Sequence, residues 1–206
     1  MTTRRIVTVS AGLSTPSSTR LLADRLTAAT EASLSDRGEK AETRTVELRD
    51  LAHDIMNAMT TRVPTGDLPG VLEDIAAADG VIAVTPVFNA SYSGLFKSFF
   101  DIVEPEALDG TPVLVAATGG SPRHSLVLEH ALRPMFSYAR SVVVPTGVYA
   151  ASEDWGAGDG GGRELSERVD RAARQLAVLA ADHAPGKADP FEEPTSFAEL
   201  MSGLGT

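Results

Sequence analysis

Short apolar runs alternate along the chain with longer segments in which apolar residues recur at helical spacing. The runs at 80–84 and 110–118 are rich in Val and Ala, as expected for strands buried on both faces of a sheet. Further strands are predicted at 4–10, 42–48 and 141–149, the second of them nearer the edge because polar and apolar residues alternate in it. Helices are predicted at 20–37, 51–59, 70–78, 93–103, 122–138 and 164–182. Five strands that alternate with helices predict an α/β fold, a doubly wound five-stranded parallel sheet of order 2-1-3-4-5 with helices on both faces.

The third strand is followed by a polar and aromatic loop. Because Pro86 has no amide hydrogen, we expect the strand to end at Thr85-Pro86 and the loop to run through about Tyr92. Ser93 is suited to cap the helix that follows. The loop therefore lies at the carboxyl end of a strand, where open α/β sheets bind their ligands.

A second proline stands inside the helix predicted at 122–138. Pro134 removes one backbone hydrogen bond and crowds the carbonyl group of His130. We therefore expect a kink or a π-bulge between these two residues.

Length and composition indicate one domain over residues 1–183. A chain of 206 residues with 43% hydrophobic residues can fill a substantial core. From residue 184 the composition shifts to Pro, Gly, Asp and Glu, so residues 184–206 form a separate tail. Its Phe and Leu residues favour docking on its own or a neighbouring subunit, and disorder is the alternative.

Charge and residue usage exclude several classes of function. The absence of Cys excludes disulfides, thiolate nucleophiles and Cys-ligated metals, and His53 and His183 have no partners at metal-ligand spacing. A net charge of −10 disfavours nonspecific attraction to nucleic acid or to an anionic membrane. No apolar run approaches the roughly 20 residues that cross a bilayer, and the amino terminus lacks a signal-peptide core, so we expect a cytoplasmic protein. Any redox chemistry must come from a cofactor.

The loop after the first strand is crowded with hydroxyl groups and precedes a helix. Amide groups at a helix amino terminus attract phosphate, and Ser17, Ser18 and Thr19 can add hydroxyl donors. Neither a Gly-x-Gly-x-x-Gly pattern nor a Gly-Lys-Ser/Thr pattern occurs here, which favours a mononucleotide phosphate. An ordinary helix cap and turn explains the same serines. After the fourth strand, Gly119 and Gly120 allow the backbone to approach a flat ligand closely.

Three segments at these loops resemble the NAD(P)H-dependent FMN reductase family, a branch of the flavodoxin-like fold. They are Ser10-Ala-Gly-Leu-Ser-Thr-Pro-Ser-Ser-Thr-Arg20, Thr85-Pro-Val-Phe-Asn-Ala-Ser-Tyr-Ser-Gly-Leu-Phe-Lys-Ser-Phe-Phe-Asp101 and Ala117-Thr-Gly-Gly-Ser-Pro-Arg-His124. The middle segment is the most specific. The resemblance covers about residues 4–150 and extends to reductases that supply reduced FMN to two-component flavin monooxygenases.

The resemblance implies a set of cofactor-binding residues in three groups. The first group would hold the FMN phosphate, the second would line the ribityl chain and ring edge, and the third would pass beneath the ring. In that order they are Ser10, Ser17, Ser18 and Thr19; Pro86, Val87, Phe88 and Asn89; and Thr118, Gly119 and Gly120. Many relatives have Tyr at the position of Phe88 and Arg at that of Ser14. The loss of that Arg predicts that the flavin is held less tightly, which would suit a protein that releases the flavin as its product.

The implied reaction is hydride transfer from NADPH or NADH to FMN, for which no catalytic acid or base is assigned. Arg20, Arg123 and Arg133 are candidates for the 2′-phosphate of NADPH by charge alone. A quinone or azo reductase that retains FMN, and a flavodoxin-like electron carrier without nicotinamide activity, are the alternatives. The implied partners are flavin and nicotinamide nucleotides and a flavin-dependent monooxygenase.

Aromatic residues on two helices predict self-association. The helix residues Phe96, Phe99, Phe100, Phe136 and Tyr138 offer more apolar surface than one sheet face needs. We expect the surplus to form a homodimer interface, with dimers able to pair into tetramers. Lys97 and Asp101, four residues apart, are expected to form a surface ion pair.

Overall fold

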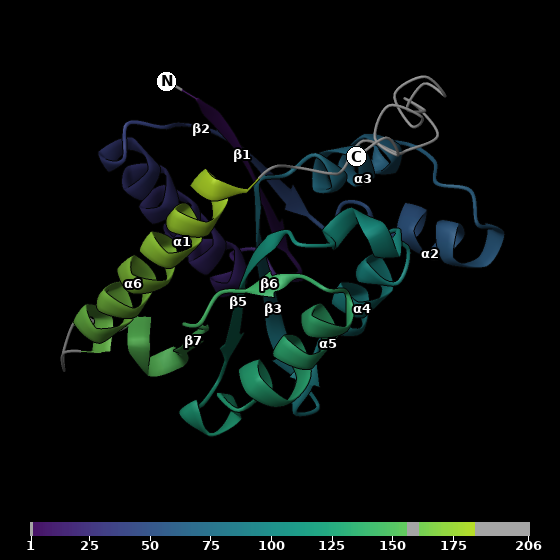
Figure 1. Ribbon diagram of the computed structural model, residues 1–206. Helices are drawn as coiled ribbons and strands as arrows, with labels where there is room; N and C mark the ends of the chain where they lie inside the picture. Colours follow the sequence, from purple (N-terminus) through teal and green to yellow (C-terminus); the bar gives the residue numbers. More distant parts are fainter. Residues whose placement is uncertain (1, 156–160, 184–206) are drawn as a thin grey trace, which may run out of the picture.

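The computed structural model describes residues 2–155 and 161–183, which form a sheet between two layers of helices (Figure 1). The sheet has seven strands, of which five lie in the order β2-β1-β3-β5-β6. All pairs along this path are parallel, whereas β4 pairs antiparallel with β3, and β7 pairs parallel with β5. The strands are β1 (Thr3–Ser10), β2 (Lys40–Glu47), β3 (Gly80–Phe88), β4 (Ser91–Tyr92), β5 (Pro112–Gly119), β6 (Val142–Val143) and β7 (Val148–Ala151).

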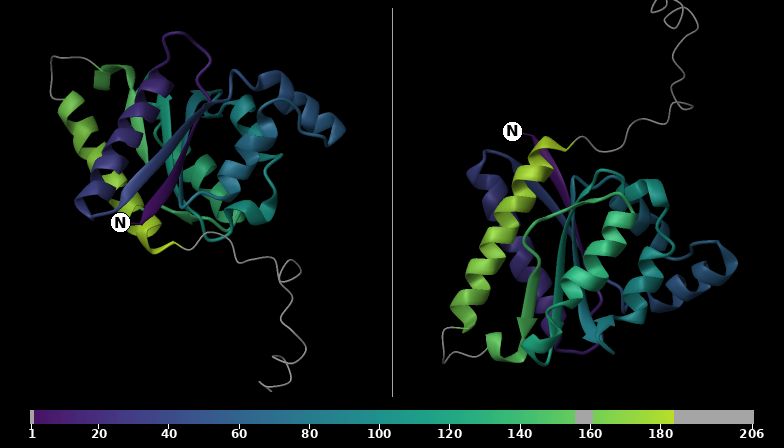
Figure 2. Two further views of the ribbon diagram at one scale, coloured as in Figure 1. Left: turned by 90° about the horizontal axis from the view of Figure 1, so that it is seen from above. Right: turned by 60° about the horizontal axis from the view of Figure 1, so that its bottom comes forward.

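Helices cover both faces of the sheet, as the sequence predicts. Helices α1 and α6 lie side by side on one face, and α2 to α5 lie on the other (Figures 1 and 2). The α-helices are α1 (Ser18–Asp36), α2 (Ala52–Thr61), α3 (Leu68–Ala76), α4 (Gly94–Phe100), α5 (Arg133–Tyr138) and α6 (Gly161–Asp182). Short 3₁₀ turns are η1 (Pro105–Leu108), η2 (Pro122–His124) and η4 (Ser152–Trp155), and η3 (Leu128–Leu132) is a π-helix.

Each face of the sheet has its own hydrophobic core. Leu22 and Leu26 of α1 pack with Leu176 of α6 against one face. Phe96 and Phe99 of α4 belong to the core on the other face, together with apolar residues of α2, α3 and α5. Burial on both faces explains why β3 and β5 read as continuous apolar runs.

The prediction of five strands is wrong for the last strand, which is divided. Segment 141–149 forms β6 and β7, and both pair with β5 at different places along it. Pro145 lies between them and has no amide hydrogen, so it cannot continue the ladder. The next amide, that of Thr146, instead donates to the side chain of Gln175 on α6 at 2.9 Å.

The third strand also continues further than predicted. β3 runs past Pro86 to Phe88 and then folds back as the short strand β4, with Val87 opposite Tyr92. Pro86 still takes a place in the ladder, opposite Thr118 of β5, because the parallel pairing does not need a donor from every residue. The predicted helix cap is confirmed, since Ser93 Oγ accepts a hydrogen bond from the amide of Phe96 at 3.2 Å.

The predicted irregularity before Pro134 is confirmed as a π-helix. It spans Leu128–Leu132, and α5 begins directly after it. The helix predicted at 122–138 is otherwise wrong at its start, because η2 and a turn occupy 122–126 before helical residues begin. Pro134 cannot donate an i to i−4 bond, which favours a wider turn just before it.

Other predictions fall at the ends of the chain. The tail at 184–206 lies outside the described residues. Within the described ranges, no helix is both long enough and apolar enough to cross a bilayer. The cytoplasmic location stays a prediction.

Candidate functional site

A pocket of about 450 Å³ opens at the carboxyl ends of the parallel strands. The three segments that the sequence singles out meet there: the loop after β1, the end of β3 and the turn after β5. The lining residues are Leu13, Ser14, Ser17, Ser18, Thr19, Pro86, Val87, Phe88, Thr118, Gly119, Gly120, Ser152 and Trp155.

The loop after β1 is folded tightly against the start of α1. Ser17 is the N-cap of α1, and its Oγ accepts a hydrogen bond from the amide of Arg20 at 3.2 Å. Gly12 is required nearby because a Cβ at this position would clash with the Ser17 hydroxyl group. The hydroxyl hydrogen of Ser17 stays available as a donor, and Ser18 is exposed beside it. Serine hydroxyls and free amides at a helix amino terminus suit an anion.

The first turn of α1 is joined directly to the end of β5. Thr19 Oγ1 and Thr118 Oγ1 lie 2.8 Å apart, and both residues are buried. Ser10, at the end of β1, is fully buried, and its Oγ has no hydrogen-bond partner among the described residues. Thr19 and Thr118 therefore bring hydroxyl groups to the pocket lining, whereas Ser10 lies beneath it.

The end of β3 and β4 form a tight hairpin beside the pocket. Asn89 and Ala90 have φ angles of 49° and 62°, the left-handed pair that a two-residue hairpin turn requires. Thr85 fixes the base of the hairpin, since its Oγ1 accepts from the amide of Ser93 at 3.0 Å. Phe88 is 47% exposed and presents its ring at the pocket mouth.

The turn after β5 is narrow because a tyrosine packs against it. A Cβ at Gly119 would clash with the hydroxyl group of Tyr149, and this hydroxyl donates to the carbonyl oxygen of Ser121 at 2.8 Å. Burial, with a smaller contribution from Asp154, raises the pKa of Tyr149, so the hydroxyl stays protonated. Gly120 has open space around it. The backbone at this turn thus presents an unobstructed surface to the pocket.

The structure brings most of the predicted site residues together. All of them except Ser10 and Asn89 line the pocket. Ser10 lies beneath the surface, and Asn89 stands exposed at the hairpin tip. Sequence reasoning did not assign four of the lining residues to the site: Leu13, Ser14, Ser152 and Trp155.

Trp155 closes one side of the pocket. Its ring is packed by the guanidinium of Arg25 at 4.9 Å and contacts the core between α1 and α6. Trp155 ends η4, far along the chain from the three segments. Only the return of β7 to the same sheet edge brings it to the site, which explains why no local pattern revealed it.

Two of the three arginines proposed for the NADPH phosphate are already engaged. Arg20 bonds Asp24 at 2.7 Å and Glu47 at 2.6 Å. Arg133 bonds Glu129 at 2.7 Å, and it also donates to the carbonyl oxygens of Val144 and Pro145. Arg123 has no ion pair within residues 2–155 and 161–183, and it follows Gly120 closely in an exposed turn.

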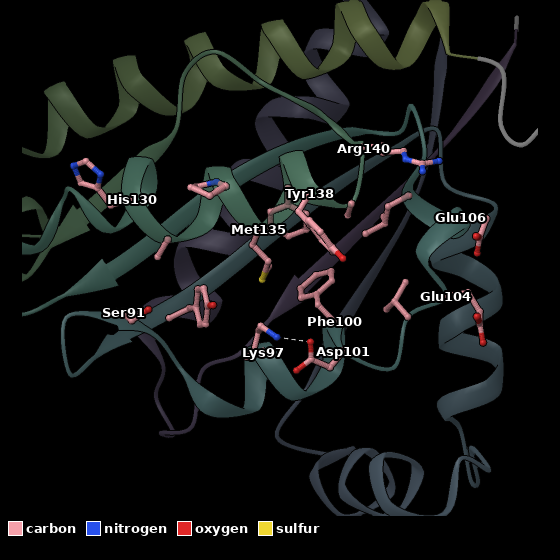
Figure 3. A pocket seen from close by; sticks show the side chains of 17 residues that line it. Ser91, Lys97, Phe100, Asp101, Glu104, Glu106, His130, Met135, Tyr138 and Arg140 are labelled. Atoms are coloured by element: carbon pink, nitrogen blue, oxygen red, sulfur yellow. Dashed lines mark hydrogen bonds and ion pairs between the residues drawn. The ribbon is translucent and has the colours of Figure 1, made fainter.

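A larger cavity of about 910 Å³ lies elsewhere, between α4 and α5 (Figure 3). Phe100, Met135 and Tyr138 line it, and Tyr138 is 92% exposed. The expected ion pair of Lys97 and Asp101 is confirmed at its edge. The prediction that Phe96, Phe99 and Phe136 supply surplus apolar surface is wrong, because all three are buried in the core beneath α4 and α5.

The parallel sheet, the hydroxyl-rich loop before α1 and the pocket at the strand ends define a flavodoxin-like α/β protein. Residues 4–156 match the family model described as NADPH-dependent FMN reductase. The chain belongs to this family.

Close relatives support the assignment. The chain is 38% identical to an FMN reductase (NADPH) of Pseudomonas aeruginosa over 177 residues, covering 85% of this chain and 91% of the relative. It is 37% identical to the NADH-dependent FMN reductase SfnF of Pseudomonas fluorescens, with 87% and 93% covered. A solved oxidoreductase of Corynebacterium diphtheriae is 52% identical, with a TM-score of 0.85, and 89% of this chain and all of that chain, 100%, are covered.

Proposed function

We propose that this protein reduces FMN with NADPH or NADH and releases the reduced flavin to a partner monooxygenase. The observation that carries the proposal is the pocket at the strand ends, which is lined both by the serines before α1 and by the turn at Gly119 and Gly120. When bound, FMN supplies the redox chemistry by accepting a hydride from the nicotinamide ring. The protein contributes binding, orientation and stabilisation of charge.

The residues present fit FMN. Ser17, Ser18 and the amino terminus of α1 would hold the phosphate group, which needs donors and a positive end of a helix. The backbone at Gly119 and Gly120, which lines the pocket, would lie beneath the ring, and the missing Cβ of Gly119 leaves room for the Tyr149 hydroxyl group at this turn. Amide groups near this turn and near Asn89 would stabilise negative charge on the reduced ring.

The composition of the loop between β1 and α1 (residues 11–17, the phosphate loop) favours release of the flavin. Position 14, where many relatives have Arg, is an exposed Ser, and Arg20 is engaged by two carboxylates. A site that binds a dianion mainly with hydroxyl and amide groups holds it less tightly than one with a free guanidinium. Loose binding allows FMN to act as substrate and product.

Two alternatives predict other results. A quinone or azo reductase would retain FMN through dialysis and reduce the organic acceptor rapidly. An electron carrier would bind FMN without being reduced by a nicotinamide.

Steady-state kinetics separate these functions. NADPH and NADH oxidation is measured with free FMN, FAD, riboflavin and a quinone, using protein freed of flavin. We expect FMN-dependent oxidation that saturates with free FMN and is weaker with riboflavin. Rapid quinone reduction by retained flavin would favour the first alternative, and no nicotinamide oxidation would favour the carrier.

We further propose that the cavity between α4 and α5 is covered by a second copy of this chain. Tyr138 stands almost fully exposed beside the half-buried Phe100 and Met135 (Figure 3). A large exposed aromatic side chain beside a hollow that has apolar residues at its centre and charged residues such as Lys97, Glu104 and Arg140 around it suits a subunit contact. The same contact, repeated about a twofold axis, would give a homodimer, from which tetramers can form.

A further inference from the structure

A chain of ion pairs runs beside the loop predicted to bind the phosphate. Glu47, the last residue of β2, lies between two arginines. Its Oε1 is 2.6 Å from Arg20 Nη1, and its Oε2 is 3.9 Å from Arg49 Nη2. Both arginine side chains are only partly exposed, at 37% for Arg20 and 35% for Arg49.

Each arginine is attached to one side of the phosphate loop. Arg20 stands in the first turn of α1, and its amide is held by the N-cap Ser17. Arg49 follows β2 and donates to the carbonyl oxygen of Ser14 at 3.5 Å and to the hydroxyl group of Thr15. Glu47 therefore connects the two cations that flank this loop. Sequence spacing gave no sign of the connection, because Arg49 lies 35 residues from Ser14.

Carboxylates outnumber the cations in this chain of ion pairs. Asp24 contacts Arg20 at 2.7 Å and Asp50 contacts Arg49 at 3.3 Å, so with Glu47 three carboxylates face two guanidinium groups, a net charge of −1. Hydrogen bonding to Asp24 raises the pKa of Arg20, against the effect of burial, and the two charges of Glu47 and Asp24 add to the rise. Arg20 and Arg49 both keep their positive charges, and the neighbouring carboxylates balance these charges before any phosphate binds.

We propose that Glu47 sets how loosely the protein holds the 5′-phosphate of FMN, by neutralising Arg20 and Arg49 beside the phosphate loop. The inference rests on the proposed function and assigns Glu47 a specificity-determining role that does not involve contact with the reacting atoms. Its carboxylate lowers the attraction for a phosphorylated flavin and leaves the attraction for the ring unchanged. The arrangement favours release of reduced FMN.

The variant Glu47→Gln tests the proposal through flavin affinity. FMN and riboflavin, which lacks the phosphate, are titrated by fluorescence quenching at low and high salt. Removal of one negative charge is expected to tighten FMN binding about three- to tenfold at low salt and less at high salt. Riboflavin affinity should stay within about twofold, since no phosphate is present to respond.

A matched control comes from the same strand. Glu42→Gln removes one carboxylate of β2 that pairs with Arg5 at 4.0 Å, at the other end of the sheet from the phosphate loop. Glu42→Gln changes the net charge of the protein by the same amount as Glu47→Gln, and it should leave the affinity for FMN unchanged. Arg49→Gln should weaken FMN binding, and the double variant Glu47→Gln, Arg49→Gln should return close to the wild-type affinity.

The outcomes separate this inference from the proposed function. Unchanged or weaker FMN binding in a folded Glu47→Gln variant, or an equal gain for riboflavin, overturns the role of Glu47 while the proposed function stands. Wild-type protein that quenches neither flavin overturns both. Thermal melting of each variant shows that it is folded.

Discussion

The hydroxyl groups of Thr19 and Thr118 lie 2.8 Å apart and join the first turn of α1 to the end of β5. The two residues belong to two of the three segments that line the pocket where we propose that FMN binds. Because both residues are buried, water cannot readily replace this hydrogen bond, and its loss would destabilise the fold. The bond fixes the distance between the phosphate loop and the glycine turn.

Thr118→Val should lower the free energy of unfolding by about 1–3 kcal/mol, because it leaves the Thr19 hydroxyl buried without a partner. The double variant Thr19→Val, Thr118→Val should cost less than the sum of the single variants, since both polar groups are then removed. Urea denaturation of the four proteins measures this cycle. Additive losses would show that the hydroxyl pair contributes no coupling.

Gly119→Ala should weaken FMN binding and lower the free energy of unfolding by about 1–3 kcal/mol, because the new Cβ displaces Tyr149. Gly120→Ala is the control for the free energy of unfolding alone, since no protein atom lies within 4 Å of a Cβ at that position, whereas Gly120 itself lines the proposed flavin site. Flavin titration and urea denaturation give both quantities. Combining Gly119→Ala with Tyr149→Phe should recover part of the lost free energy of unfolding. If nothing is recovered, the Tyr149 hydroxyl group is not what the new Cβ displaces.

The polar segments of the site were predictable because local chemistry marks each of them. Ser17 and Ser93 are helix caps, and Gly119 ends an apolar run, so each signal is contained in a few neighbouring residues. The order of the strands followed from their alternation with helices. Two predicted site residues lie outside the pocket lining, because a local pattern shows neither that Ser10 is buried beneath the pocket nor that Asn89 stands at an exposed hairpin tip.

What the sequence did not reveal depends on distant contacts. The division of the last strand reflects both Pro145 and the bond between Thr146 and Gln175 of α6. Trp155 reaches the pocket only because β7 ends beside β5. Helical periodicity also could not separate Phe96, which is buried in the core, from Tyr138, which is exposed.

Tyr138→Glu should convert a homodimer to a monomer, because burying a new charge beside Phe100 and Met135 in the proposed contact is costly. Val178→Glu is the control, since Val178 is 43% exposed on α6, which covers the opposite face of the sheet. Sedimentation velocity at micromolar concentration measures both variants. A wild-type protein that sediments only as a monomer contradicts the interface.

His183 should make the protein less stable in mild acid. Burial lowers the pKa of His183 below its ordinary value, with Asp79 opposing this shift and Arg4 adding to it. As pH falls below about 6.5, the unfolded chain takes up the proton first, so stability decreases until the folded-state pKa is passed. The urea concentration at the unfolding midpoint is measured at pH 7.5 and at lower pH. It should fall less with decreasing pH in His183→Gln than in the wild type.

The exposed His53 on α2 provides the comparison for that experiment. His53→Gln should retain the acid sensitivity of the wild type. If the urea midpoint falls equally with decreasing pH in His183→Gln and in the wild type, His183 is not the cause of the acid sensitivity.

Flavin binding beside the single tryptophan of the chain tests the central claim most directly. Trp155 lines the pocket, so its emission should be quenched saturably as FMN is added. Ser18→Asp, which puts a negative charge at the phosphate loop, should shift the FMN titration to higher concentration and leave the riboflavin titration in place. Tryptophan emission that does not respond to FMN, or a Ser18→Asp variant that binds FMN as the wild type does, would contradict the proposed site.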